Sequence, residues 1–145
     1  VERAIIGTIW QQQKRENVAD APMFPNQMKG TLPQELAQAE KLGVKPAQPG
    51  TPEFDAAIQS GTVKWAVLED GTLVVVPKFV NGVEISHAVL SGGARVAAAG
   101  EAEIAGASSS GYYGLDINFH SGHFWPSEAS LQIGKNAFAM FGIGF

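Results

Sequence analysis

Two of the three histidines in the chain, His120 and His123, lie only three residues apart. An imidazole titrates near neutral pH, so a pair of them can supply a general acid and a general base. Asp116 precedes them at strand spacing, and a carboxylate on the same face can orient an imidazole. We therefore expect His120 and His123 to transfer protons, with His87 or Glu101 as the alternative base.

Other polar and aromatic residues near this window have the chemistry to bind a substrate. An arginine can contact a phosphate, and exposed aromatic rings can stack on a base. The expected substrate-binding residues are Arg95, Asp116, Asn118, Ser121, Tyr113 and Trp125, with Tyr112 as a further stacking candidate. A purely structural alternative is that His120 caps a strand end and His123 packs against Trp125.

Metal binding is the less favoured interpretation of the same histidines. The spacing H-x-x-H can bind zinc, but there is no helical HExxH motif and nothing marks a third ligand. We therefore predict no metal site and no cofactor.

Composition limits the class of protein. The chain has 145 residues, no cysteine, 45% hydrophobic residues and a net charge of −4 with a pI near 5.3. The absence of cysteine excludes disulfides and thiolate chemistry. An acidic chain is unlike proteins that wrap long nucleic acids, although a compact site that touches one or two phosphates is allowed.

The ends and apolar segments of the chain also carry expectations. No apolar run approaches the roughly 18 residues of a membrane span, and we identify no secretory signal. The first residue is Val1, so we expect a piece of a longer protein.

The elements that must position these residues form one α+β domain over residues 1–145. Residues 1–60 are predicted to be helices and loops, because Thr31 and Gln34 have capping-box spacing and Thr51-Pro52 is a typical helix start. Residues 62–124 show a period of two and are predicted to form an antiparallel meander of about five strands. Ser127 should cap a closing helix over residues 128–141 that Gly142 ends, so this part covers 127–142.

The sheet contains a predicted hairpin with an Asp70-Gly71 turn, followed by strands over 83–90, 94–106 and 112–124. If the last two strands are neighbours, one face carries both acidic and basic groups. This face would present Arg95, Glu101 and Glu103 beside Asp116, Asn118 and His120. The small side chains of Ala97 and Ala99 would leave room for a ligand above the sheet.

Two motifs carry a resemblance to a known class of proteins. "SHAVLSGG" (86–93) and "NFHSGHFWPS" (118–127), within about residues 30–145, resemble the C-terminal toxin domains of bacterial polymorphic toxins of the Rhs and contact-dependent type. The resemblance implies a secreted or delivered effector that acts in the cytoplasm of a target cell. It also implies a large carrier protein and a cognate immunity protein as partners.

The order of helices and sheet is also similar to the barnase–EndoU–colicin–RelE group of ribonucleases. The resemblance does not carry over barnase's catalytic glutamate, because Gly114 stands about where that residue would be. The first hypothesis is therefore a metal-independent ribonuclease with a histidine acid/base pair and RNA as substrate. It predicts that His120→Ala or His123→Ala abolishes toxicity.

Two alternatives stay open. An ADP-ribosyltransferase or NAD-consuming toxin would hold the ribose with His87, stack nicotinamide on Tyr112 or Tyr113, and stabilise positive charge with Glu101 or Glu103. A non-catalytic binding or assembly module would use the histidines only for packing.

Overall fold

The computed structural model describes residues 2–145, with side chains from residue 8 onward. Its helices are α1 (Glu2–Val18), α2 (Leu32–Lys41), α3 (Pro52–Gln59) and α4 (Leu131–Ala139), with short 3-10 helices η1 (Lys29–Thr31), η2 (His87–Leu90) and η3 (Glu128–Ser130). The strands are β1 (Val63–Leu68), β2 (Leu73–Pro77), β3 (Phe79–Val80), β4 (Val83–Glu84), β5 (Val96–Ala107) and β6 (Gly111–Ile117). The predicted α+β class is confirmed.

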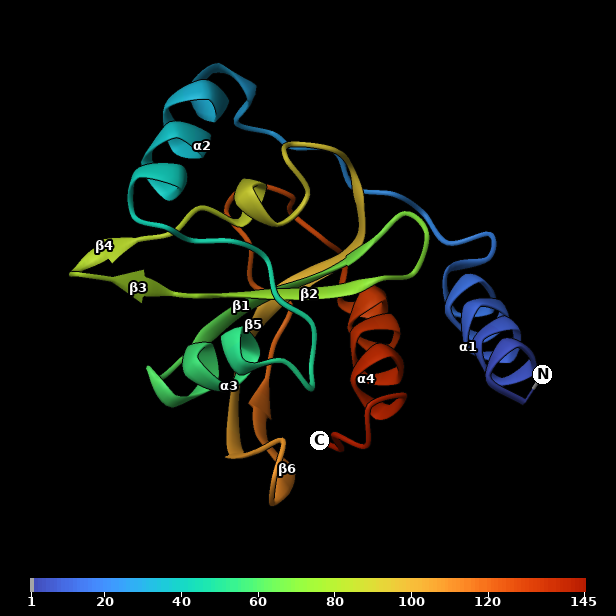
Figure 1. The fold of residues 1–145 in the computed structure, drawn as a ribbon. Helices are drawn as coiled ribbons and strands as arrows, with labels where there is room; N and C mark the ends of the chain where they lie inside the picture. Colours follow the sequence, from blue (N-terminus) through green and yellow to red (C-terminus); the bar gives the residue numbers. More distant parts are fainter. Residues whose placement is uncertain (1) are drawn as a thin grey trace.

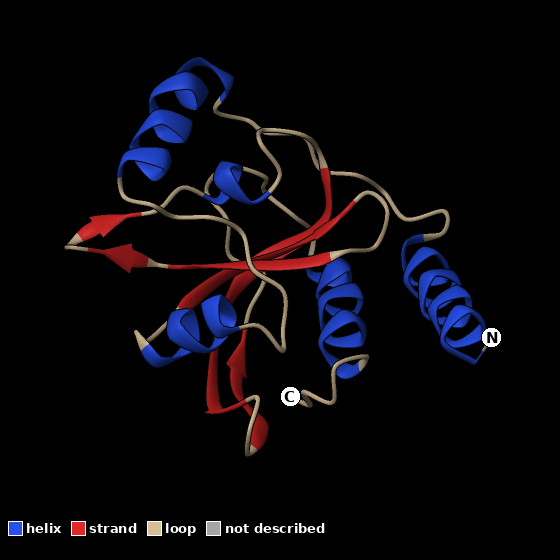
Figure 2. Ribbon diagram, viewed as in Figure 1, coloured by secondary structure: helices blue, strands red, loops and turns tan. Residues whose placement is uncertain are grey.

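A four-stranded antiparallel sheet of order β2-β1-β5-β6 forms the centre of the fold (Figures 1 and 2). Two hairpins, β1–β2 and β5–β6, therefore join side by side through β1 and β5 instead of following one another in a simple meander. A separate two-stranded hairpin, β3–β4, extends from one side of the sheet. The predicted turn at Asp70-Gly71 connects β1 to β2, and Gly71 has the positive φ of 91° that this turn requires.

Helices cover both faces of the sheet and divide its apolar residues into two clusters. On one face lie α3 and α4. Phe54 of α3 and Phe138 of α4 pack in one cluster with Trp65 of β1, and all three are fully buried. On the other face, α2 and η2 pack over a second cluster that includes Ala66, Val76 and Phe124. Alternate residues of β1 and β2 point into the two clusters, as expected for strands covered on both sides.

Helix ends follow the local signals that predict them. The hydroxyl of Thr51 accepts a hydrogen bond from the Phe54 amide at 3.2 Å and so caps α3. Gly43 follows α2 with φ of 72°, and Gly142 follows α4 with φ of 77°. The capping box at Thr31 is the exception, because the Thr31 side chain makes no capping hydrogen bond.

Helix α1 packs at the edge of the molecule, against α4 and the β1–β2 turn. Trp10 contacts Phe141 edge-on with ring centroids 5.0 Å apart, and the Asn17 amide donates to the Ile133 carbonyl. The sequence spaces Ile5, Ile6, Ile9 and Trp10 as a short apolar stripe at helical spacing. The side chains of Ile5 and Ile6 lie outside the described residues.

The predicted strand over 83–90 is wrong beyond Glu84. Ser86 accepts a hydrogen bond from the Ala88 amide at 3.0 Å, and this cap starts the 3-10 helix η2. A serine side chain that caps in this way competes with strand pairing. His87 consequently lies on a helical turn and not on the predicted strand.

The predicted strand over 112–124 ends at Ile117. Beyond it the chain crosses directly over β5 at Gly100, where an added Cβ would lie 1.9 Å from the Asn118 carbonyl oxygen. Only glycine permits such a close approach. Residues 118–127 therefore form a loop, called here the crossing loop, that carries His120, His123 and Trp125.

The predicted ligand space above Ala97 and Ala99 does not exist, because both alanines are fully buried. Ala99 packs with η2 and Phe124, and Ala97 packs in the cluster under α3 and α4.

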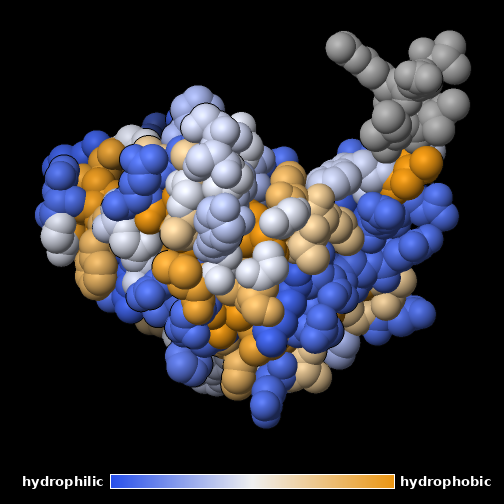
Figure 3. All heavy atoms as spheres, turned by 90° about the horizontal axis from the view of Figure 1, so that it is seen from below, coloured by the Kyte–Doolittle hydropathy of each residue, from blue (hydrophilic) through white to orange (hydrophobic). Residues whose placement is uncertain are grey.

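The outer surface mixes polar and apolar groups. Figure 3 shows one end of the molecule, where hydrophobic residues lie in separate patches among polar ones. In the part of the chain that is described, no helix combines the length and apolar character needed to cross a bilayer.

Candidate functional site

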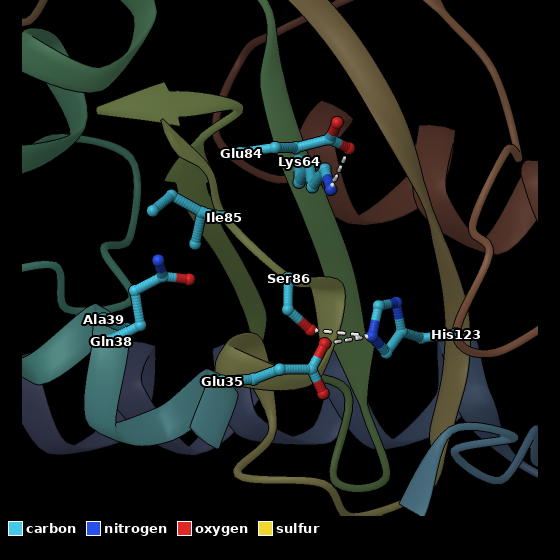
Figure 4. A pocket seen from close by; sticks show the side chains of 8 residues that line it. All are labelled: Glu35, Gln38, Ala39, Lys64, Glu84, Ile85, Ser86 and His123. Atoms are coloured by element: carbon cyan, nitrogen blue, oxygen red, sulfur yellow. Dashed lines mark hydrogen bonds and ion pairs between the residues drawn. The ribbon is translucent and has the colours of Figure 1, made fainter. Parts of the chain in front are cut away.

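A polar pocket lies between α2, the start of η2 and the crossing loop (Figure 4). The imidazole Nε2 of His123 lies 2.5 Å from the carboxylate Oε2 of Glu35 and 3.0 Å from the hydroxyl of Ser86. His123 and Glu35 are mostly buried, with side-chain exposures of 13% and 16%. Three segments that are distant in sequence thus converge on one imidazole.

Glu35 is held in place from its own helix. The Thr31 hydroxyl, one turn earlier, donates to Glu35 Oε1 at 3.1 Å, while Oε2 meets His123. Thr31 therefore orients the carboxylate of Glu35 and does not form the expected capping box with Gln34.

The backbone of the crossing loop fixes His123. The Gln27 amide donates to the His123 carbonyl at 2.6 Å, and the Phe124 amide donates to the Ser121 hydroxyl at 3.3 Å. Phe124 is buried in the cluster under η2, with 1% of its surface exposed. A packed phenylalanine next in sequence leaves the imidazole little freedom to move.

Lys64 and Glu84 supply two further charges to the pocket. The Lys64 ammonium lies 2.9 Å from Glu84 Oε2, and this hydrogen bond lowers the pKa of the Glu84 carboxyl. Lys64 is 5% exposed, whereas the Glu84 side chain is 55% exposed. A buried lysine needs a partner, and an incoming phosphate would be a stronger one than an exposed carboxylate.

The pocket holds about 160 Å³. This corresponds to roughly five water molecules at about 30 Å³ each. A phosphate with part of a ribose is of this size, whereas pockets that enclose whole drug-sized ligands usually exceed about 300 Å³. The remaining lining residues are Gln38, Ala39 and Ile85.

His87 lies beneath this site and is not part of its surface. It is 1% exposed, and its Nε2 donates to the Gly100 carbonyl oxygen at 2.8 Å. Burial lowers the pKa of His87 to about 3, and the charges of Lys64 and His123 add to the effect. His87 is therefore neutral at physiological pH and holds the crossing point of the chain.

The arrangement favours general acid/base chemistry over a nucleophilic serine. In a Ser-His-Glu triad, the acid and the serine contact opposite nitrogens of the imidazole. Here Glu35 and Ser86 both contact the same nitrogen, Nε2, so the triad arrangement is not formed. An imidazole and a carboxylate in contact are groups that can serve as a proton donor and a proton acceptor.

The two strands predicted to be neighbours, β5 and β6, do pair, and they bring together part of the predicted face of acidic and basic groups. Glu103 and Asp116 are cross-strand partners, and the Asn118 side chain accepts hydrogen bonds from the Glu101 and His120 amides, each at 3.0 Å. Asn118 thereby stabilises the crossing loop. The Glu101 carboxylate accepts from the Lys78 ammonium at 3.2 Å.

The remaining predicted residues do not line the pocket. Arg95 precedes β5, is exposed and pairs with Glu69, so it does not join Glu101 and Glu103 as expected. Tyr113 is 65% exposed on β6, opposite Ala105 near the hairpin tip. His120 is exposed on the crossing loop and rests beside Phe119.

Tyr112 has a structural role instead of a stacking one. Its hydroxyl donates to the Asp55 carboxylate at 2.5 Å and accepts from the Gly50 amide at 3.1 Å. The hydrogen bond from Tyr112 also lowers the pKa of Asp55. The constellation required for the NAD hypothesis, which joins His87, Tyr112 or Tyr113 and Glu101 or Glu103, is therefore not assembled around one cavity.

Sequence reasoning missed Glu35, Lys64, Ser86 and Glu84. Lys64 had a usable signal, because it is a charged residue in a strand that is otherwise buried on both faces. Glu35 had none, since it is 88 residues away from His123 and is one of several acidic residues on helices.

Comparisons with protein families, curated proteins and solved structures found no match for this chain. Within the described residues, no cluster of three or more histidine and acidic side chains has the geometry to hold a metal ion.

Proposed function

We propose that this domain is a metal-independent endoribonuclease that acts as an antibacterial toxin. The observation that supports the proposal best is the contact between His123 and Glu35 in a pocket that also contains the buried ammonium of Lys64. A proton donor, a proton acceptor and a cation are the three groups that cleavage of RNA by its own 2′-hydroxyl requires.

The proposed reaction is a transesterification at phosphorus. Glu35 removes the proton from the ribose 2′-hydroxyl, and the 2′-oxygen forms a bond to phosphorus. The bond from phosphorus to the 5′-oxygen breaks, and His123 protonates that oxygen. Lys64 stabilises the charge that develops on the phosphoryl oxygens. The products are a 2′,3′-cyclic phosphate and a free 5′-hydroxyl.

The short contact between the two groups also explains how the site returns to its starting state. His123 enters this step as the imidazolium, so after cleavage it is a neutral imidazole and Glu35 carries a proton. Their oxygen and nitrogen lie 2.5 Å apart in the free protein, so the proton can return directly once the products leave.

The biological setting follows from the resemblance of "SHAVLSGG" and "NFHSGHFWPS" to polymorphic toxin domains. In this setting the domain is delivered by a carrier protein, cleaves RNA in the cytoplasm of a target cell, and is neutralised by a cognate immunity protein. No cofactor takes part.

The test is RNA cleavage by the purified domain carrying His123→Ala or Glu35→Gln. Each change removes one proton-transfer group, so we expect a loss of at least about 100-fold in the cleavage rate. Circular dichroism and thermal melting verify that each variant is folded. The wild-type products should carry 2′,3′-cyclic phosphate ends.

Matched controls use groups of the same type outside the pocket. Glu40→Gln alters another carboxylate of α2, and His120→Ala removes the exposed imidazole of the crossing loop. Both should cleave RNA at close to the wild-type rate. Near-normal cleavage by both pocket variants would exclude this mechanism, and NAD loss without RNA cleavage would favour the NAD-consuming alternative.

A further inference from the structure

Trp125 has a backbone conformation that its side chain disfavours. Its φ is +48°, and the other non-glycine residues with positive φ are Asp20 and Asn81, among the described residues. Asp and Asn tolerate this left-handed region, whereas a bulky residue is a true outlier there. The following Pro126 restricts Trp125 further, because a residue before proline prefers extended conformations.

The strain places a large aromatic ring in solvent. Trp125 is 66% exposed, although Phe124 and Pro126 on either side of it are both buried. The Trp125 amide donates to the Ser121 carbonyl at 3.2 Å, and the indole Nε1 donates to the Gly122 carbonyl at 2.9 Å. The ring is thus fixed by its own loop while its surface remains uncovered. Backbone strain of this kind is concentrated at functional sites, such as active sites and ligand-binding positions.

The backbone of Trp125 also lies near the proposed reaction centre. Trp125 follows His123 by two residues, so their Cα atoms are at most about 7 Å apart. The pocket of about 160 Å³ has the size of a phosphate with part of a ribose, so a base attached to a ribose bound there would remain outside.

We propose that Trp125 stacks on an unpaired base next to the scissile phosphate, and that the substrate is single-stranded RNA. The inference rests on the proposed ribonuclease function. A base in a duplex is already stacked and paired, whereas an unpaired base can turn onto an aromatic side chain. Trp125 is therefore a specificity-determining residue, and it takes no part in proton transfer.

The experiment measures binding without cleavage, in the Glu35→Gln background. The probe is a fluorescein-labelled single-stranded oligoribonucleotide, compared with the same strand annealed to its complement. Trp125→Leu should weaken single-strand binding by between about fivefold and 150-fold, the usual range for one stacked base. Trp125→Phe should retain most of the affinity, and the duplex should bind more weakly than the single strand.

Phe79→Leu is the matched control, because Phe79 is another exposed ring, at 51%, on a different element. It should leave RNA binding unchanged. Trp125→Gly tests the strain separately: glycine adopts positive φ freely, so this variant should melt at a higher temperature than Trp125→Leu while binding RNA no better.

The outcomes separate the two proposals. If wild-type protein cleaves single-stranded RNA but Trp125→Leu binds and cleaves it normally, the stacking role is wrong and the ribonuclease function stands. Equal binding of duplex and single strand by the Glu35→Gln protein also overturns the stacking role. If the protein neither binds nor cleaves RNA, both proposals fail.

Discussion

His87 shows how a buried histidine can support a site without taking part in its chemistry. Its Nε2 holds the Gly100 carbonyl, at the point where the crossing loop passes over β5. Its folded-state pKa is about 3, against an ordinary value near 6.5, because burial disfavours the imidazolium. The neutral imidazole of His87 avoids placing a second buried positive charge close to Lys64.

The depressed pKa of His87 predicts how stability depends on pH. Between pH 6.5 and 3 the unfolded chain binds a proton at His87 that the folded protein does not bind. This contribution to stability is therefore complete above pH 6.5 and is lost as the pH falls toward 3. The free energy of unfolding should decrease by up to about 1.4 kcal/mol per pH unit in this window from this one group.

His87→Gln isolates this effect, because its amide can still donate to Gly100 but does not titrate. Urea unfolding at pH 7, 6 and 5 should give a shallower pH dependence for this variant than for the wild type, even though its stability at pH 7 is lower. His120→Gln, which changes an exposed imidazole, should keep the wild-type slope. An unchanged slope in His87→Gln would show that His87 is protonated in the folded state.

At the scale of elements, the position of α4 depends on one glycine. Gly134 faces Trp65 of β1, and a Cβ at position 134 would lie 2.3 Å from the Trp65 ring. Trp65 cannot move away easily, because it is fully buried and its indole donates to the Glu101 carbonyl at 3.1 Å. Helix α4 and the sheet strand that carries Lys64 are therefore in direct contact.

Gly134→Ala should destabilise the protein although alanine favours helix. Overpacking against Trp65 costs about 1–3 kcal/mol, and the gain in helix propensity is at most about 1 kcal/mol. Thermal or urea unfolding measures the difference, with Gln132→Ala on the exposed side of α4 as the control.

A double-mutant cycle tests the cause. Trp65→Phe removes the ring atoms that the new methyl group would meet, so Gly134→Ala should cost less in that background. Equal costs of Gly134→Ala in both backgrounds would mean that the contact with Trp65 is not responsible.

The elements that the sequence predicts correctly are those set by adjacent residues. Thr51-Pro52 starts α3, Gly43 follows the end of α2, and Asp70-Gly71 turns the first hairpin, because each signal acts within a few residues. The predicted strands are wrong at 85–90 and 118–124, where the alternation of side chains does not reveal the contacts that end each strand. The cap at Ser86 and the crossing at Gly100 alter the chain where alternation alone favours a strand.

The candidate site shows the same division between local and distant causes. His123 could be selected because it lies three residues from His120, close after the carboxylate of Asp116. Its partner Glu35 could not, since only tertiary packing brings α2 to the crossing loop. Arg95 was selected for its chemistry, but its position before β5 places it beside Glu69. Residue type indicates what a side chain can do, and packing decides which groups meet.

At the scale of the whole molecule, charge limits how much RNA the proposed ribonuclease could contact. The chain has 14 acidic and 10 basic residues, so its surface does not attract a long polyanion. Several of its cations already have acidic partners: Lys64 pairs with Glu84, Lys78 with Glu101, and Arg95 with Glu69. The proposed ribonuclease therefore recognises its substrate through a few contacts at the pocket.

This limit predicts a weak dependence of activity on salt. Each phosphate contact to a single strand contributes about −0.7 to the slope of log affinity against log salt concentration. One or two contacts give a slope between about −0.7 and −1.4, so kcat/KM should fall only about three- to sevenfold between 50 and 200 mM salt. Cleavage of a labelled single-stranded oligoribonucleotide, measured below KM across this range, gives the slope directly.

Lys64→Gln should make the salt slope shallower by about 0.7. Lys45→Gln changes an exposed lysine outside the pocket and should leave the slope unchanged. A wild-type slope near −4 would instead require an extended basic track, and the pocket could then not be the main RNA contact.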